Sequence, residues 1–180
     1  MKKTARVIVT FKCNRSCPGC CNTDLPPYRT IHRPEDLLNY EEIVITGGEP
    51  LLIDICVYQL LRDLKEAEYN GRIYMYTAMW GALHSYAVIL NDLDGITFTL
   101  HAECTDMDIY ALNRLSKELQ SRWINSRLFI DTRVYERYDL SNIDLTGWSV
   151  IRKLQWQEHC DPAPNEDLIY FDLEEYYGQK

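Results

Sequence analysis

Short apolar runs alternate with segments of helical period along most of the chain. The apolar runs predict six β-strands, over residues 5–11, 42–46, 72–77, 95–100, 127–132 and 148–154. Helical spacing and helix start signals predict helices between them, over residues 34–40, 53–68, 83–90 and 105–119. Strands that are apolar throughout and joined by helices are typical of parallel sheets, which are covered on both faces. The pattern therefore predicts an α/β fold with parallel strands.

Six strands are too few for a closed barrel of eight. We therefore expect an open partial (β/α)6 barrel of the TIM type, in a single domain over residues 1–180. Its core covers about residues 5–155, and the tail over 156–180 contains one edge strand, at 168–173. Sites in barrels of this kind lie at the carboxyl ends of the strands, so residues that follow the strands are the first candidates for function.

Three cysteines follow the first strand in the order C-x3-C-x2-C: Cys13, Cys17 and Cys20. Thiolates bind iron–sulfur clusters or zinc. Three thiolates can hold three irons of a four-iron cluster, which leaves the fourth iron open to a small molecule. Two other interpretations stay open: a zinc ion held by the three cysteines with His32 or another group, or a group of packed thiols without a metal.

The other four cysteines do not extend this motif. Cys21 adjoins Cys20, and neighbouring side chains do not easily reach the same metal, so we treat Cys21 as a non-ligand. Cys56, Cys104 and Cys160 are isolated in the sequence, and isolated cysteines usually pack as small apolar side chains.

A second motif follows the second strand, in the stretch ITGGEPLL over residues 45–52. Gly47 and Gly48 can form a tight strand–helix turn, which is the interpretation that the motif alone favours. They also allow a ligand to approach the backbone, whose carbonyl oxygens could accept hydrogen bonds from an ammonium group. Glu49 adds a negative charge or orients the turn, and Pro50 stiffens it.

The two motifs together, each at the end of a predicted strand, resemble the radical S-adenosylmethionine superfamily. The resemblance covers residues 5–155 and is most specific at 13–20 and 45–52. It implies that the three cysteines ligate a [4Fe–4S] cluster and that S-adenosylmethionine binds the fourth iron beside residues 47–50. It also implies an enzyme in which the reduced cluster, fed by an external electron donor, cleaves S-adenosylmethionine. The products are methionine and a 5′-deoxyadenosyl radical that abstracts hydrogen from a substrate.

By the same resemblance, the ends of further strands contribute polar contacts to the cofactor. The candidates in this chain are Thr77, Thr99, His101 and Arg133. Thr99 and His101 alternate with Leu100, so both can face the barrel interior. Structural alternatives stay open: the threonines also suit any strand, His101 could be a core histidine, and Arg133 could pair with a surface acid.

The net charge and the targeting signals limit which classes of partner and which compartment we expect. The chain has 19 Lys and Arg against 27 Asp and Glu, a net charge of −8. This balance argues against sequence-independent binding to nucleic-acid phosphates. No apolar stretch follows the N-terminus as an export signal would, and no run approaches the length of a membrane span. We therefore expect a cytoplasmic protein, in which seven cysteines stay free or bind metal.

The expected substrate is a peptide or protein, because the chain is short and has no separate substrate domain to cover the open side of a barrel. The alternative is a small molecule such as a nucleoside, covered by residues 134–147 and the tail. Candidate contacts from the tail are Trp156, Glu158, His159, Asp161 and Glu166.

The subfamily stays open. The C-P-G-C stretch resembles small glycyl-radical activating enzymes, whereas Asn14 and the T-F-K-C lead-in resemble peptide- and small-molecule-modifying members. A non-enzymatic iron–sulfur or zinc-binding protein is the remaining alternative.

Overall fold

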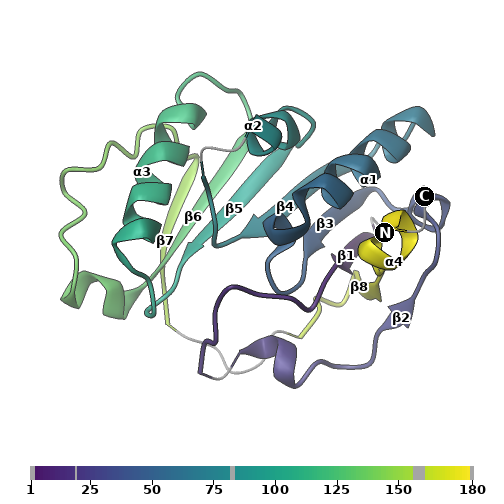
Figure 1. Cartoon of the computed structure of the whole chain (residues 1–180), viewed down its shortest axis with the longest axis horizontal. Helices are drawn as coiled ribbons and strands as arrows, with labels where there is room; N and C mark the ends of the chain where they lie inside the picture. Colours follow the sequence, from purple (N-terminus) through teal and green to yellow (C-terminus); the bar gives the residue numbers. More distant parts are fainter. Residues whose placement is uncertain (1–2, 19, 82–83, 156–160, 179–180) are drawn as a thin grey trace.

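The computed structural model describes residues 3–18, 20–81, 84–155 and 161–178, with the side chain of Cys21 outside this description. The described residues form eight strands: β1 Thr4–Ile8, β2 Arg29–Thr30, β3 Glu42–Thr46, β4 Arg72–Thr77, β5 Gly95–Leu100, β6 Asn125–Asp131, β7 Val150–Leu154 and β8 Glu166–Tyr170. They make one sheet in the order β2-β8-β1-β3-β4-β5-β6-β7 (Figure 1), and every neighbouring pair is parallel. The α/β class with parallel strands is confirmed.

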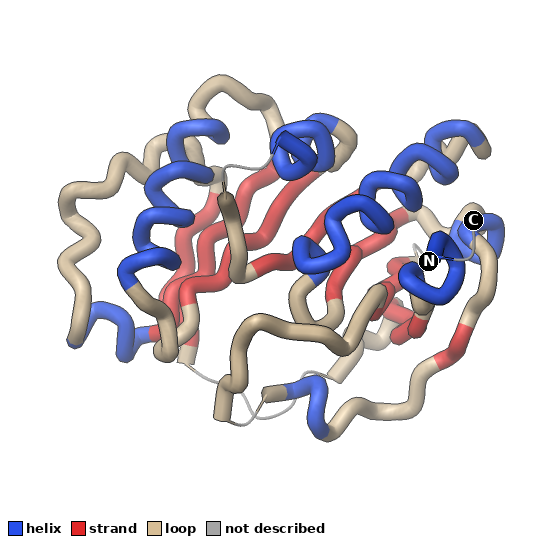
Figure 2. Tube along the Cα trace, in the orientation of Figure 1, coloured by secondary structure: helices blue, strands red, loops and turns tan. Residues whose placement is uncertain are grey.

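The α-helices share one face of this sheet. They are α1 Asp54–Glu66, α2 His84–Asn91, α3 Asp106–Leu119 and α4 Leu173–Gly178. Short 3-10 helices lie at Cys21–Thr23, Pro34–Leu37, Pro50–Ile53 and Thr132–Glu136. Figure 2 shows α1, α2 and α3 along the same side of the strands. No helix among the described residues has the length and apolar run needed to cross a membrane.

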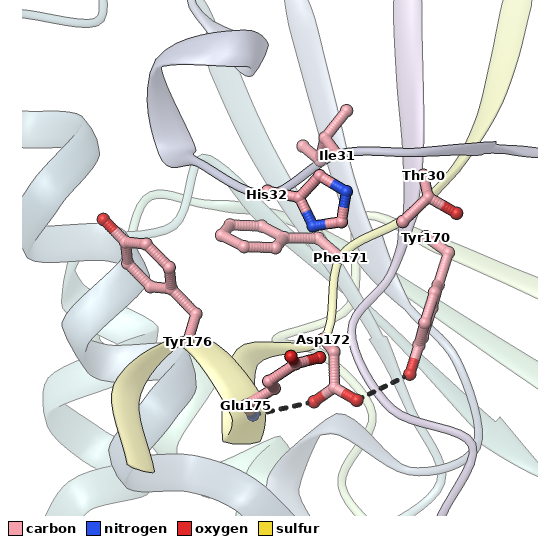
Figure 3. A pocket seen from close by; sticks show the side chains of 8 residues that line it. All are labelled: Thr30, Ile31, His32, Tyr170, Phe171, Asp172, Glu175 and Tyr176. Atoms are coloured by element: carbon pink, nitrogen blue, oxygen red, sulfur yellow. Dashed lines mark hydrogen bonds between the residues drawn. The ribbon is translucent and has the colours of Figure 1, made fainter. Parts of the chain in front are cut away.

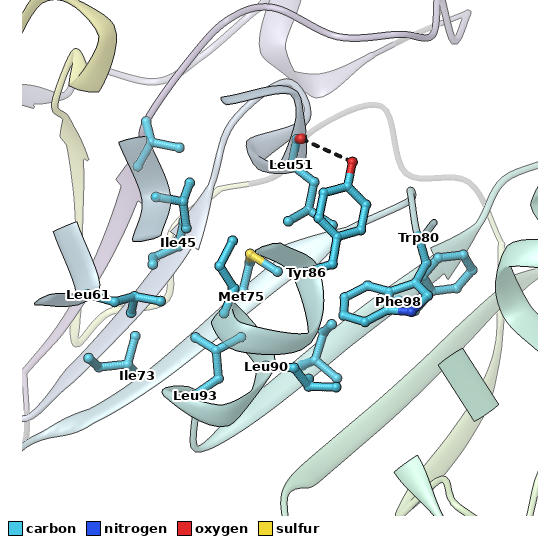
Figure 4. Packing of buried hydrophobic residues seen from close by; sticks show 14 of the residues in the cluster. Ile45, Leu51, Leu61, Ile73, Met75, Trp80, Tyr86, Leu90, Leu93 and Phe98 are labelled. Carbon is cyan, nitrogen blue, oxygen red and sulfur yellow. Dashed lines mark hydrogen bonds between the residues drawn. The ribbon is translucent and has the colours of Figure 1, made fainter. Parts of the chain in front are cut away.

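The main core lies between these helices and the sheet. Strand residues that alternate along the chain, such as Met75 and Phe98, are fully buried there. Figure 4 shows them beside Tyr86 and Leu90 of α2, where the Tyr86 hydroxyl donates to the carbonyl oxygen of Leu51 (3.3 Å). Burial of apolar side chains is the main stabilising term in a domain of this size, so this face fixes where each strand ends.

The intervening strand residues point to the opposite side, which we call the second face. Its side chains include Arg6, Val44, Tyr74, Tyr76, Thr97, Thr99, Arg127, Phe129, Arg152 and Leu168. Several are buried, as Val44, Tyr74 and Thr97 are, but Tyr76 and Arg152 are exposed. The second face thus remains open in part where β4 to β7 run.

The inner strands lie where the apolar runs predict them. The bounds of β3, β4 and β5 equal the predicted ranges, and the predicted helices at 53–68, 83–90 and 105–119 correspond to α1, α2 and α3. The first strand is shorter than predicted and ends at Ile8. Its continuation turns away because the backbone at Thr10 and Lys12 bonds to residues 48 and 49 instead of a strand.

Three predictions about the rest were wrong. The described sheet has eight strands, where six strands and one edge strand in the tail were predicted, because the two-residue β2 also joins it. β8 covers 166–170 and not 168–173, and it is not an edge strand, since it lies between β2 and β1. The helix predicted over 34–40 is only a 3-10 turn at Pro34–Leu37.

Candidate functional site

The three cysteines of the motif lie in the segment over residues 9–20, which we call the cysteine loop. The loop leaves the carboxyl end of β1 (dark purple in Figure 1). Cys13 is exposed, and Cys17 and Cys20 are half-buried. A turn closes the second half, since the Cys20 N–H donates to the Cys17 carbonyl oxygen (3.1 Å). All three thiols are free in this structure.

Cys17 has the most perturbed thiol of the loop. Burial raises the pKa of Cys17 to about 11, followed by repulsion from Glu103 and from the other two cysteines, while Arg15 opposes the shift. A thiol with a raised pKa is protonated at neutral pH, so a metal that binds Cys17 must displace its proton.

The described residues contain no group of three or more His, Cys, Asp and Glu side chains placed to hold one metal ion. Such a group is what the zinc interpretation with His32 requires. His32 lies in a pocket of about 410 Å³ beside Phe171, Asp172 and Glu175 (Figure 3). The requirement for a four-iron cluster differs, because each cysteine binds a different iron and the sulfurs lie farther apart than the ligands of one ion.

Residues 47–50, the glycine strip, hold the cysteine loop by its backbone. The Gly48 N–H donates to the carbonyl oxygen of Thr10 and the Glu49 N–H to that of Lys12, both at 2.8 Å. Gly47 has a φ of +138°. A Cβ on Gly47 would lie 2.3 Å from the Thr10 oxygen, and one on Gly48 would lie 2.1 Å from the Lys12 oxygen. Both glycines are therefore required because two backbone segments cross without room for a side chain.

This contact changes the interpretation of the strip. The sequence suggests close approach by a ligand, whereas the space at both Cα atoms is filled by the cysteine loop itself. The Gly47 carbonyl oxygen accepts a hydrogen bond from the side-chain amide of Asn22 (2.8 Å). The strip thus fixes the loop at both ends, from Thr10 before the cysteines to Asn22 after them.

Glu49 orients the turn, which is one of the two roles expected for it. Its side chain is 1% exposed, and Pro50 follows it at the first position of a 3-10 helix. The carboxylate accepts hydrogen bonds from the Leu51 N–H (3.1 Å), the Thr77 hydroxyl (2.6 Å) and the Ala78 N–H (2.8 Å). Burial raises the pKa of Glu49, and these three bonds oppose the rise.

The Thr77 hydroxyl, a predicted cofactor contact, donates to the Glu49 carboxylate. Its hydroxyl also accepts from the Met79 N–H (3.0 Å), and its side chain is buried. The pair connects the end of β3 to the end of β4. A threonine at this position thus has a role beyond strand propensity, namely to complete the shell of a buried carboxylate.

Thr99 and His101 stand at the end of β5, as predicted, on the second face. Thr99 is half-buried, and no hydrogen bond of its hydroxyl is present within the described part of the chain. Burial lowers the pKa of His101, with Arg15 as the second cause, so the ring is neutral near pH 7. A neutral imidazole keeps one nitrogen as an acceptor and one as a donor.

Arg133 has a partner within its own turn. Its guanidinium binds the Asp131 carboxylate through two nitrogens, at 3.0 and 2.7 Å, and the Arg133 N–H donates to the same group. Arg133 thus pairs with an acidic side chain, as its structural alternative required, although Asp131 is buried rather than on the surface. The bond to Arg133 lowers the pKa of Asp131.

Two charged residues at this site belong to neither sequence motif. Arg15, between the first two cysteines, is 9% exposed and forms a two-nitrogen ion pair with Asp108 in the first turn of α3. Its guanidinium also donates to the Ala78 carbonyl oxygen (2.8 Å). Burial acts to raise the pKa of Asp108, but Arg15 and Thr105 outweigh it and leave the pKa low. Arg15 therefore clamps the cysteine loop to β4 and α3.

Glu103 is the second group. Its Oε2 atom is buried and has no hydrogen-bond partner among the described residues. Its charge acts on Cys17, His101 and Arg133, which places it between the cysteine loop and the ends of β5 and β6. In the sequence this region is marked only by Thr105 and Asp108, whose spacing resembles a weak capping box, and the structure confirms that box.

The remaining cysteines and the tail residues contribute less to the candidate site. Cys104 is buried in the core, and Cys56 of α1 packs against the edge of the same core. Both are placed as expected of isolated thiols. Glu166 pairs with Arg6. Trp156, Glu158 and His159, predicted as candidate substrate contacts, lie outside the described residues, as do the isolated Cys160 and the side chain of Cys21.

A scan against protein-family models finds no match to this chain, and a search of curated proteins finds none either. The resemblance to a family therefore depends on the two motifs and on how their residues are arranged.

Proposed function

We propose that this protein is a radical S-adenosylmethionine enzyme. The observation that carries the proposal is the pairing of the two motifs: the Gly48 and Glu49 N–H groups bind the backbone of the cysteine loop. This contact fixes the three cysteines next to the glycine strip. Cys13, Cys17 and Cys20 would then hold the cluster beside the glycine strip.

The chemistry on which the proposal depends belongs to the cofactors. When bound, the reduced [4Fe–4S] cluster supplies the electron that cleaves S-adenosylmethionine into methionine and a 5′-deoxyadenosyl radical. The protein supplies geometry: Arg15 and residues 47–49 position the cysteine loop, and Glu49 with Thr77 holds the strip to β4. An external protein or chemical reductant is required as a partner.

A buried carboxylate oxygen that lacks a hydrogen-bond partner among the described residues supports the fit of these cofactors. A buried carboxylate oxygen without a partner costs about 1–3 kcal/mol, and such atoms are rare unless a ligand or water completes them. Glu103 Oε2 is one of these, on the side of the loop that faces Cys17. We propose that Glu103 accepts a hydrogen bond from a hydroxyl or ammonium group of the bound cofactor. Thr99, His101 and Arg133 line the same edge.

The partial barrel is part of the same proposal. We infer that β1 and β3 to β7 form the six strands of a partial TIM-type barrel whose interior is the second face. We also propose that the protein works in the cytoplasm, because a reducing compartment keeps the thiols available for a cluster.

The test is cofactor cleavage. The protein is loaded anaerobically with iron and sulfide, reduced with dithionite and given S-adenosylmethionine, and 5′-deoxyadenosine is quantified. We expect product from the wild type and from Cys56→Ala, which removes a thiol of α1 that packs against the core. We expect none from Cys17→Ala. An iron-loaded wild type that makes no 5′-deoxyadenosine, or product that persists without Cys17, would contradict the proposal.

A further inference from the structure

The second face of the sheet carries an unbalanced positive charge. Most charged side chains that the described strands direct to this face are paired: Arg6 with Glu166, Arg72 with Glu42, and Asp131 with Arg133. Arg127 and Arg152 are left over, since neither has an ion pair or hydrogen bond within the described part of the chain. In a chain of net charge −8, two uncompensated arginines on one face require an explanation.

The register brings these two arginines together. Arg127 of β6 aligns with Val150, and Arg152 of β7 aligns with Phe129, so they are diagonal neighbours on adjacent strands. Strand spacing and rise put their Cα atoms about 8 Å apart, within reach of one small group for side chains of this length. The Arg127 guanidinium lies 5.5 Å from the centre of the Tyr74 ring. This stacking orients the guanidinium and leaves its charge in place.

Two hydroxyl groups on the same face stand level with the arginines, each two strands away. Tyr76 aligns with Arg127 through Thr97, and Thr99 aligns with Arg152 through Phe129. Tyr76 is 36% exposed. Neither hydroxyl has a hydrogen-bond partner among the residues that the structure describes. Among the described residues, the face therefore offers two arginines without an ion pair and two hydroxyl donors without a hydrogen-bond partner, across β4 to β7.

An oxyanion matches this set. A guanidinium binds the oxygens of a carboxylate or phosphate through two parallel N–H bonds, and hydroxyl groups can donate to the remaining oxygens. We propose that a carboxylate or phosphate group of the substrate binds on the second face between Arg127 and Arg152. This inference rests on the proposed function, and it names the chemical class of the substrate.

The register also sets the size of the substrate. His101, at the end of β5, stands level with Asp131, two residues beyond Arg152 and four beyond Arg127 in the aligned strands. At about 3.3 Å per residue, the oxyanion lies about 7–13 Å from the edge that holds the cysteine loop. A metabolite or a single amino-acid side chain spans this distance. The oxyanion would anchor the substrate, and its reactive carbon would extend towards the cysteine loop.

The test uses the full chain without cofactors and follows the arginine Nε–H groups by NMR. Inorganic phosphate and succinate are titrated separately, with sodium chloride added to keep the ionic strength constant. We expect saturable shifts at Arg127 and Arg152, and about tenfold weaker binding in Arg127→Gln and Arg152→Gln, because a charge-assisted hydrogen bond contributes about that factor. Tighter phosphate binding indicates a phosphate ester as the substrate, and tighter succinate binding indicates a carboxylate.

Arg72→Gln is the matched control, since Arg72 is on the same face but paired with Glu42. It is expected to leave anion binding unchanged, and urea unfolding is expected to show that all three variants remain folded. Absence of saturable shifts with either anion, or equal shifts at the surface residue Arg62, would overturn the inference. Because the titration needs no cluster, its failure is separate from failure of 5′-deoxyadenosine formation.

Discussion

Gly48→Ala is expected to prevent cluster loading and to destabilise the protein without cofactors. The new Cβ would lie 2.1 Å from the Lys12 carbonyl oxygen, 2.6 Å from its carbon and 2.8 Å from the Phe11 carbonyl oxygen. These are backbone atoms, so no side chain can rotate to relieve the contact. Overpacking of this kind costs about 1–3 kcal/mol, and the displaced loop also loses the bond from the Gly48 N–H to Thr10.

Two measurements check this prediction: urea unfolding of the protein without cofactors, and iron per chain after anaerobic reconstitution. Gly178→Ala is the matched control, because a Cβ at Gly178 meets nothing within 4 Å. The control also corrects for the lower unfolded-state entropy of alanine, which affects both variants. Full iron content and unchanged stability in Gly48→Ala would show that the strip does not position the cysteine loop.

Arg15→Gln is expected to lower stability by about 3 kcal/mol and to reduce iron loading, because it leaves Asp108 with an uncompensated charge. The pair is mostly shielded from water, with Arg15 at 9% and Asp108 at 15% side-chain exposure. Removing one partner of a buried pair costs more than the pair itself contributes, since the remaining charge stays desolvated. The loop also loses its bond to the Ala78 carbonyl oxygen.

Urea unfolding measures the loss, and two comparisons isolate its cause. Arg62→Gln breaks an exposed i,i+4 pair with Glu66, for which we expect a loss of less than about 0.5 kcal/mol. The double variant Arg15→Gln with Asp108→Asn removes both charges, and we expect it to lose less than the sum of the two single variants. Additive losses would mean that the two groups stabilise the fold independently.

The parts of the fold that the sequence predicts are those fixed by local signals. β3, β4 and β5 are short runs rich in apolar residues, and their bounds match the prediction because the side chains on one face of each strand are buried in the main core. The capping box at Thr105 and Asp108 is equally local and is confirmed. The C-x3-C-x2-C spacing and the glycine strip are also local, so the candidate site residues could be named before their arrangement was known.

The rest depends on pairing between distant residues. β8 enters the sheet beside β1 across some 160 residues, and no periodicity within 166–170 distinguishes that place from an edge. Arg15 and Asp108 are 93 positions apart. From the sequence, the glycine strip could be a tight turn or a surface that a ligand approaches, because a glycine pattern shows that something comes close without showing what. The structure identifies it as the backbone of Thr10 and Lys12.

The central claim is that three cysteines hold a four-iron cluster with one iron open to S-adenosylmethionine. Its most direct test is the EPR spectrum of the reconstituted, reduced protein, recorded with and without S-adenosylmethionine beside an iron and zinc analysis. We predict about four irons per chain and a reduced-cluster signal whose g-values shift when S-adenosylmethionine is added. A spectrum unchanged at saturating S-adenosylmethionine, or a protein that retains zinc and no iron, would contradict the account.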